Sequence, residues 1–128
     1  MVDIRAIHHV SLLVSDTGRA LTFYRDLLGL VVDGARPDMD YPGAWLRMDN
    51  AQIHLLELPD VLRGSARPEH GGRDRHVALS VADLDALVTA LETAGVAYTL
   101  SRSGRRALFC RDPDGNAIEL VERSADHQ

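Results

Sequence analysis

The stretch HVSLLVSD at residues 9–16 decides the fold, because the chain repeats it as HVALSVAD at residues 76–83. The two copies share the histidine, both valines, one leucine and the closing aspartate. Within each copy, large apolar residues alternate with small or polar ones, which is typical of a β-strand with one covered face. A strand that returns with the same pattern predicts a chain made of two copies of one structural unit.

A helix is expected after each of these strands. Asp16 and Asp83 are residues of a type that caps helix N-termini, and apolar residues follow at three- and four-residue spacing. Gly29 and Gly95 end the two patterns, since glycine adopts the left-handed conformation of a helix C-terminus at least cost. The apolar residues are Leu21, Tyr24 and Leu28 in the first helix, and Leu84, Leu87, Val88 and Leu91 in the second.

Three short strands are expected after each helix, at residues 30–35, 44–49 and 52–58 and again at 97–102, 105–111 and 116–123. Turn-forming residues separate them, most clearly in the sequence DPDG at 112–115. Residues 59–73 contain two prolines and three glycines with little periodicity, and we interpret them as a linker.

The pattern therefore predicts an α+β protein with two βαβββ repeats, at about residues 4–58 and 74–123, in a single domain that spans 1–128. Neither repeat has enough apolar surface to fold alone, so we expect the two to cover one continuous core. That association can form within one chain or between the two chains of a dimer.

The composition of the chain excludes several classes of partner and binding site. The 128 residues carry a net charge of −5, so nucleic acid is not an expected partner. No apolar run approaches the roughly 20 residues of a membrane span, and the first ten residues lack the layout of a secretory signal. We therefore expect a cytoplasmic protein with no membrane partner. The single cysteine, Cys110, excludes a cysteine-rich zinc site and is interpreted as a small core residue.

Strand alternation places four potential metal ligands on faces lined by small residues. His9 and His76 open the first strand of each repeat, and His54 and Glu119 lie on the last strands. If a pseudo-twofold axis relates the repeats, these four side chains converge. Three imidazoles and one carboxylate suit one divalent Zn, Ni, Fe, Co or Mn ion rather than Ca or Mg.

Four further residues are candidates for contact with a small-molecule substrate. Trp45 and Arg47 alternate along one predicted strand, and Phe109 and Arg111 along its counterpart. They could provide an apolar wall and an anion anchor. The alternative is that both arginines are solvated strand charges.

The remaining charged residues and histidines have simpler interpretations. Glu57 and Glu122 are out of phase with the candidate ligands and are expected to be exterior charges. His8 is expected to face the helices and to be partly buried. His70 in the linker and His127 in the C-terminal tail are expected to be exposed.

The segments HHVSLLVSD, FYRDLLGL, RHVALSVAD and RDPDGNAIELVE resemble those of the vicinal oxygen chelate superfamily, which includes glyoxalase I, extradiol dioxygenases, fosfomycin-resistance enzymes and bleomycin-resistance proteins. The resemblance implies a curled, partly open mixed β-sheet barrel with its helices outside, often in a homodimer. It also implies that the metal positions are His9, His54, His76 and Glu119.

Glyoxalase I enzymes generally have a carboxylate where this chain has His54. With three neutral imidazoles and one carboxylate, a divalent ion gives a positive site, which holds an anionic or chelating oxygen more tightly. His54 could be a metal ligand, a hydrogen-bond partner of a ligand, or a general base near neutral pH.

The resemblance implies a glyoxalase-like lyase or isomerase. Its small substrate would chelate the metal through vicinal oxygens, and the metal would stabilise an enolate or enediolate while Glu119, or alternatively His54, moves the proton. Three alternatives stay open: an Fe(II) extradiol-type dioxygenase, a fosfomycin-type transferase, and a metal-free antibiotic-binding resistance protein.

Overall fold

The computed structural model describes residues 1–123 and divides the chain into two compact units, Met1–Val61 and Leu62–Gln128. The boundary lies in the segment that the sequence predicts as a linker. Each unit is described by itself.

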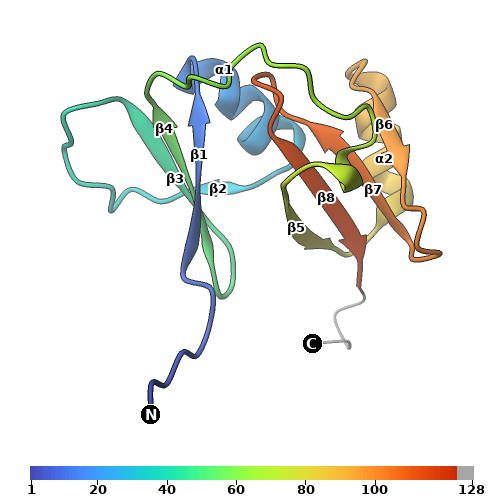
Figure 1. Ribbon diagram of the computed structural model, residues 1–128, viewed down its shortest axis with the longest axis horizontal. Helices are drawn as coiled ribbons and strands as arrows, with labels where there is room; N and C mark the ends of the chain where they lie inside the picture. The colour runs from blue at the N-terminus through green and yellow to red at the C-terminus, as the bar shows by residue number, and fades with distance from the viewer. Residues whose placement is uncertain (124–128) are drawn as a thin grey trace. The chain divides into compact units, whose positions relative to one another are not determined.

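The first unit is a four-stranded mixed sheet with one helical segment. The strand order is β1-β4-β3-β2; β1 and β4 are parallel, and the other neighbours are antiparallel (Figure 1). The elements are β1 (His9–Val14), α1 (Thr17–Leu21), the π-helix η1 (Thr22–Leu27), β2 (Val31–Val32), β3 (Gly43–Arg47) and β4 (Gln52–Glu57).

The second unit has the same strand order, β5-β8-β7-β6, with β5 and β8 parallel (Figure 1). Its elements are the 3₁₀-helix η2 (Gly71–Arg73), β5 (His76–Val81), α2 (Leu84–Thr93), β6 (Tyr98–Leu100), β7 (Ala107–Arg111) and β8 (Ala117–Glu122). The predicted α+β class and the repeated βαβββ order are therefore confirmed, and neither sheet closes on itself.

The strands are shorter than the sequence predicts, most of all β2, which has two residues instead of the six in 30–35. The backbone N–H of Asp33 still donates to Trp45, at 2.7 Å. The side chain of Asp33 then accepts from the N–H of Ala35, at 2.9 Å, and this contact turns the chain away from the sheet.

Both predicted helix caps are present. The side chain of Asp16 accepts from the N–H of Arg19, and that of Asp83 accepts from the N–H of Ala86. The first helix is not α-helical throughout, however, because it widens into η1 after Leu21. This π-helical winding buries the adjacent residues Phe23 and Tyr24 together.

The expectation that Glu57 and Glu122 are exterior charges is wrong. Glu57 accepts from the backbone N–H of Thr17, at 2.8 Å, and Glu122 from that of Leu84, at 2.9 Å. Both carboxylates therefore bind the free N–H groups at a helix start and tie the last strand of each repeat to its helix. Strand alternation alone does not reveal this role, because it needs the helix end placed beside the strand.

Glu122 is expected to make stability depend on pH. Its contact with the Arg106 guanidinium, at 2.9 Å, and with the Leu84 N–H holds the pKa of the carboxyl at about 2, below its usual value near 4.5. A lowered pKa in the folded state gives stability that is present above about pH 4.5 and is lost as pH falls toward 2. The difference in unfolding free energy between the wild type and Glu122→Gln, measured in urea, should therefore shrink over that range. A difference that stays constant from pH 7 to pH 2 would contradict the assignment.

Gly29 and Gly95 end their helices at φ of 78° and 70°, as the sequence predicts. An added Cβ at Gly95 meets no atom within 4 Å, so alanine there is strained by conformation alone. Gly95→Ala should lower the unfolding free energy by about 1 kcal/mol. Gly34 is a matched control, since its Cβ would also meet open space and its φ is not positive. Equal effects of the two substitutions, measured in urea, would contradict this explanation.

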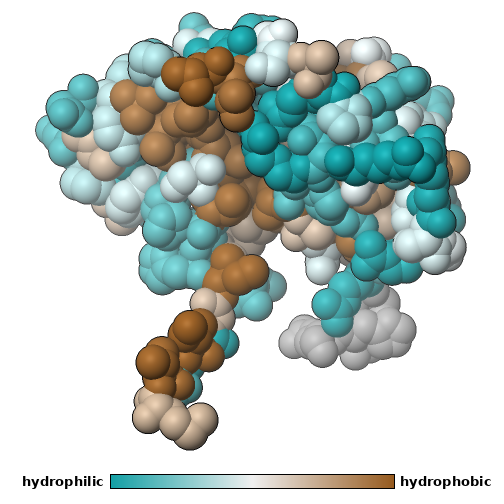
Figure 2. Space-filling model, in the orientation of Figure 1, coloured by the Kyte–Doolittle hydropathy of each residue, from teal (hydrophilic) through white to brown (hydrophobic). Residues whose placement is uncertain are grey.

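The apolar core of each unit lies between its sheet and its helix. The most buried large side chains are Val14, Tyr24, Leu46, Ile53 and Leu55 in the first unit, and Leu91, Leu108 and Ile118 in the second. Before β1, the side chains of Val2, Ile4 and Ile7 are exposed (Figure 2). None of the helices within residues 1–123 has the length and apolar character that a membrane span requires. The cytoplasmic location stays a prediction.

Candidate functional site

His76 and Glu119 meet on one face of the second sheet. β5 and β8 are parallel neighbours, and their register pairs His76 with Ala117 and Ala78 with Glu119. The two side chains therefore project from the same face, and His76 Nε2 lies 3.2 Å from Glu119 Oε1. Glu119 is only 3% exposed. This pairing is the one that strand alternation predicts within the second repeat.

The orientation of the His76 ring is set by its other nitrogen. Nδ1 lies 2.8 Å from the carbonyl oxygen of Asp74, and because a carbonyl only accepts, Nδ1 is the donor. In the neutral ring, Nε2 then has no proton and faces a carboxylate oxygen. A proton or a metal cation shared between the imidazole nitrogen and the carboxylate oxygen would stabilise this approach.

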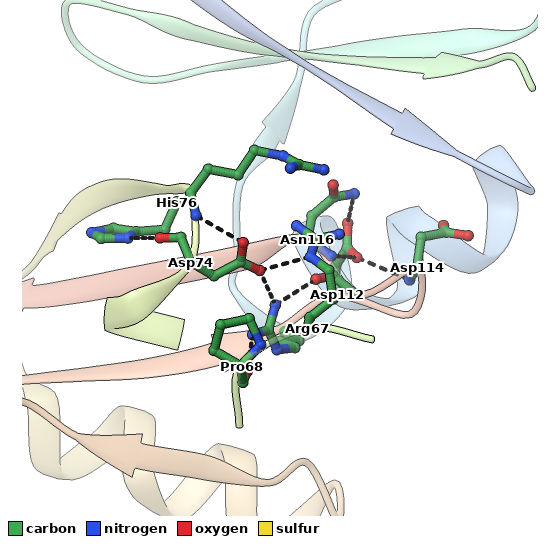
Figure 3. Close-up of polar contacts among 10 residues, drawn as sticks. Arg67, Pro68, Asp74, His76, Asp112, Asp114 and Asn116 are labelled. Atoms are coloured by element: carbon green, nitrogen blue, oxygen red, sulfur yellow. Dashed lines mark hydrogen bonds and ion pairs between the residues drawn. The ribbon is translucent and has the colours of Figure 1, made fainter. Parts of the chain in front are cut away.

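The backbone that carries this carbonyl is held by an ion-pair cluster (Figure 3). Asp74 Oδ2 accepts from Arg67 Nε, at 2.7 Å, and from the guanidinium of Arg111, at 2.9 Å. Burial raises the pKa of Asp74, but the hydrogen bonds from Arg67, Arg111 and the Arg75 N–H outweigh it and lower the pKa to about 2. The cluster therefore fixes the residue against which His76 is oriented.

A second rigid element leads into β8. The carboxylate of Asp112 accepts from the N–H groups of Asp114 and Asn116, each at 2.9 Å, and from the side chain of Asn116, at 2.8 Å (Figure 3). The turn places the start of β8, and hence Glu119 two residues after it, in a defined position.

His76 and Glu119 open into a cavity of about 360 Å³. Arg105 reaches it from the loop between β6 and β7 and donates to Glu119 Oε2, at 2.8 Å. The lining residues are His70, Gly72, Arg73, His76, Ser101, Arg102, Ser103, Arg105, Phe109 and Glu119.

The expectation that His70 is exposed is wrong. It is 8% exposed, its Nδ1 lies 2.7 Å from the hydroxyl of Thr99, and its ring packs edge-on against Phe109. Burial, followed by the positive charges of Arg102 and Arg73, lowers its pKa. A Cβ on Gly72 would lie 2.8 Å from His70 Nε2 and 3.1 Å from Phe109, so the adjacent glycines 71–72 were the sequence signal for this close packing.

In the first unit, His54 lies between two aromatic rings. His9 stacks on it with ring centroids 4.0 Å apart and planes at 13°, and Trp45 stacks on it at 4.4 Å and 9°. His54 is 8% exposed. His9 and His54 thus share a face, as strand alternation predicts, and Trp45 joins them there.

A hydrogen-bond chain fixes the His54 ring. Nε2 donates to the side-chain oxygen of Gln52, at 2.8 Å, and the amide of Gln52 donates to Asp33, at 3.0 Å. Burial, followed by the neighbouring histidines His9 and His8, lowers the pKa of His54. The neutral ring therefore presents Nδ1 as its free acceptor. His8 is exposed and contacts His9, at 2.8 Å between the Nδ1 atoms, so the expectation that it is partly buried against the helices is wrong.

The other predicted substrate residues are placed differently. Arg47 is exposed at the end of β3. The guanidinium of Arg111 contacts Asp74 and the carbonyl oxygens of Gly115 and Pro68. Phe109 contacts His76, with ring centroids 5.1 Å apart. It also lines, with Arg111, a second cavity of about 300 Å³.

Cys110, beside Phe109, is buried, and burial raises the pKa of its thiol to about 12. The prediction of a small core residue is confirmed.

Comparison with known proteins identifies the family. Residues 6–120 match the Glyoxalase/Bleomycin resistance protein/Dioxygenase superfamily, and the chain belongs to it. Members commonly use divalent metals, bind small molecules and are often dimers.

Two relatives and one solved structure illustrate the similarity. The chain is 30% identical to the uncharacterized protein YaeR of Escherichia coli, over 96% of this chain and 100% of that protein. It is 29% identical to a lactoylglutathione lyase of Haemophilus influenzae, over 93% of each. The structure of TnmS3, an antibiotic binding protein from Streptomyces, superposes with a TM-score of 0.72 at 24% identity, over 97% of this chain and all of that one.

The candidate metal ligands do not form one complete set within either unit. Among residues 1–123, no three or more His, Cys, Asp or Glu side chains already surround one point. The candidates instead form two pairs, one in each unit. His76 and Glu119 fit half of a ligand set, because an imidazole nitrogen and a carboxylate oxygen lie 3.2 Å apart. His9 and His54 supply imidazole nitrogens that suit the same borderline metals.

Proposed function

We propose that this protein is a metal-dependent lyase or isomerase of the glyoxalase type, acting on a small substrate with two vicinal oxygens. The observation that supports the proposal best is the approach of His76 Nε2 to Glu119 Oε1, at 3.2 Å. Because Nδ1 donates to Asp74, a cation shared by these two acceptors would stabilise the arrangement. Family membership and the similarity to a lactoylglutathione lyase favour the same class.

His76 and Glu119 of the second unit, with His9 and His54 of the first, are the residues that we propose hold one divalent ion. When bound, such an ion supplies the positive charge that stabilises an enolate or enediolate of the substrate. We also propose a homodimer, the assembly common in the family.

Glu119 is the residue that we propose moves the substrate proton. Arg105 holds Oε2, at 2.8 Å, so the carboxylate keeps its orientation when Oε1 changes partner. Its burial at 3% exposure keeps bulk water from competing for the proton. His54 is the second candidate base, because its hydrogen bond to Gln52 leaves Nδ1 as an acceptor.

Exchange of substrate protons with solvent tests this function. Metal-stripped protein and protein loaded with Zn, Ni, Co, Mn or Fe would be incubated in D₂O with S-lactoylglutathione or hydroxyacetone, which each carry two vicinal oxygens. We expect the C–H proton beside the carbonyl to exchange only with loaded protein, as followed by proton NMR. Iron-dependent oxygen uptake with a catechol, without proton exchange, would overturn the proposal in favour of a dioxygenase.

A further inference from the structure

The cavity that contains His76 and Glu119 is positively charged, although the whole chain carries a net charge of −5. Three arginines line it, Arg73, Arg102 and Arg105, against a single carboxylate, Glu119. The charge of the cavity lining is thus opposite in sign to the net charge of the chain. A reversed field in a concave site concentrates ligands of opposite charge.

Within residues 1–123, Arg105 is the one of these three arginines whose guanidinium contacts other side chains. Arg105 contacts Glu119 and the hydroxyl of Ser103. Across the described part of the chain, the guanidinium groups of Arg73 and Arg102 make no ion pair or hydrogen bond. Arg73 closes η2 and Arg102 lies in the loop after β6, so two separate segments present a free cation to the same cavity.

The two free guanidiniums lie around a common point. Both line the same cavity as the ring of His70, and after the larger effect of burial their positive charges also lower the pKa of that ring. The hydroxyl groups of Ser101 and Ser103 line the same space and lie 2.8 Å apart. Paired guanidiniums beside hydroxyl donors are the chemistry that recognises carboxylate and phosphonate oxygens.

We propose that Arg73 and Arg102 bind an anionic group of the substrate, a carboxylate or a phosphonate, while its vicinal oxygens lie toward His76 and Glu119. The inference rests on the proposed function in one respect, that the anion belongs to the substrate of that site. A cavity of about 360 Å³ is within the range of small-molecule sites. Arg47 and Arg111, the two arginines that the sequence suggests as an anion anchor, do not line this cavity. The guanidinium of Arg111 is bound to Asp74 and two carbonyl oxygens.

The test compares an anion with its neutral analogue. Binding of glycolate, hydroxymethylphosphonate and uncharged glycolamide would be measured by calorimetry, with metal-stripped and with metal-loaded protein. The variants are Arg73→Gln and Arg102→Gln. Arg123→Gln is the matched control, because it removes an exposed arginine outside the cavity. Urea unfolding of each variant verifies that the fold is retained.

We expect both forms of the wild type to bind the two anions more tightly than glycolamide. Each cavity variant should weaken anion binding about tenfold, or about 1.4 kcal/mol, and leave glycolamide binding unchanged. Arg123→Gln should bind all three compounds like the wild type. Equal binding of glycolate and glycolamide by the wild type, or an anion preference that survives in both cavity variants, would overturn the inference.

The two metal states separate this inference from the proposed function. An arginine-dependent anion preference in protein that binds no metal and exchanges no substrate proton would support the anion site and refute the proposed enzyme. If proton exchange depends on metal but the preference for anions is unchanged in Arg73→Gln and Arg102→Gln, the result would support the enzyme and refute the anion site.

Discussion

Replacing Glu119 with glutamine is expected to slow metal-dependent proton exchange of the substrate roughly 100- to 10,000-fold. In the wild type, Arg105 donates to Glu119 Oε2, at 2.8 Å. Glutamine keeps the length of the side chain and an oxygen that can accept from Arg105. Its amide, however, cannot take up a proton near neutral pH and is a weak metal ligand. The measurement is the rate of deuterium incorporation from D₂O, at saturating substrate and metal.

Glu69→Gln is the matched control for this substitution. Glu69 is an exposed carboxylate before η2 and does not line the cavity of His76 and Glu119. We expect it to exchange the substrate proton at the wild-type rate. Urea unfolding shows whether Glu119→Gln keeps the fold. If a folded Glu119→Gln protein exchanged the proton as fast as the wild type, Glu119 would not be the group that moves it.

Replacing Asp74 with asparagine is expected to lower the unfolding free energy by about 2 kcal/mol, because charge-assisted bonds from Arg67 and Arg111 to Oδ2 are lost. The affinity for metal should fall about tenfold as well, since the carbonyl of Asp74 orients the His76 ring. Urea unfolding measures the first effect and competition with a chelator measures the second.

Asp38→Asn is the control for Asp74, because Asp38 is an exposed aspartate in the loop before β3. It should change neither stability nor metal affinity. An Asp74→Asn protein that lost stability but bound metal like the wild type would show that the ring of His76 is oriented without this cluster.

The sequence was sufficient to predict the repeated architecture. The copies of HV-L-V-D determine the first strand and the helix cap in each repeat, and the period of two determines which side chains share a face. His9 therefore meets His54, and His76 meets Glu119, each within one sheet. The sharing of a face can be predicted because it depends on local periodicity and on the pairing of neighbouring strands, whereas the roles of these four residues stay a prediction.

The features that the sequence did not reveal depend on contacts between distant segments. Asp74 meets Arg67 and Arg111 only after the linker folds onto β7, and no periodic pattern marks that segment. Arg73 lies in the predicted linker, and β6 ends at Leu100 although the sequence predicts a strand to residue 102. Both arginines therefore lie outside the strands of the structure, where alternation does not predict the direction of a side chain. The widening of the first helix into η1, which buries the adjacent residues Phe23 and Tyr24, is likewise not predicted by a spacing of 3.6 residues.

Elemental analysis of freshly purified protein tests the central claim most directly. We predict one divalent transition-metal ion for each set of four ligands, lost or strongly reduced in His9→Ala, His76→Ala and Glu119→Gln. His54→Ala decides whether His54 is a ligand, because full metal content in that variant would remove it from the set. A folded wild-type protein that contains no such ion and binds none when Zn, Ni, Co, Mn or Fe is supplied would contradict the account.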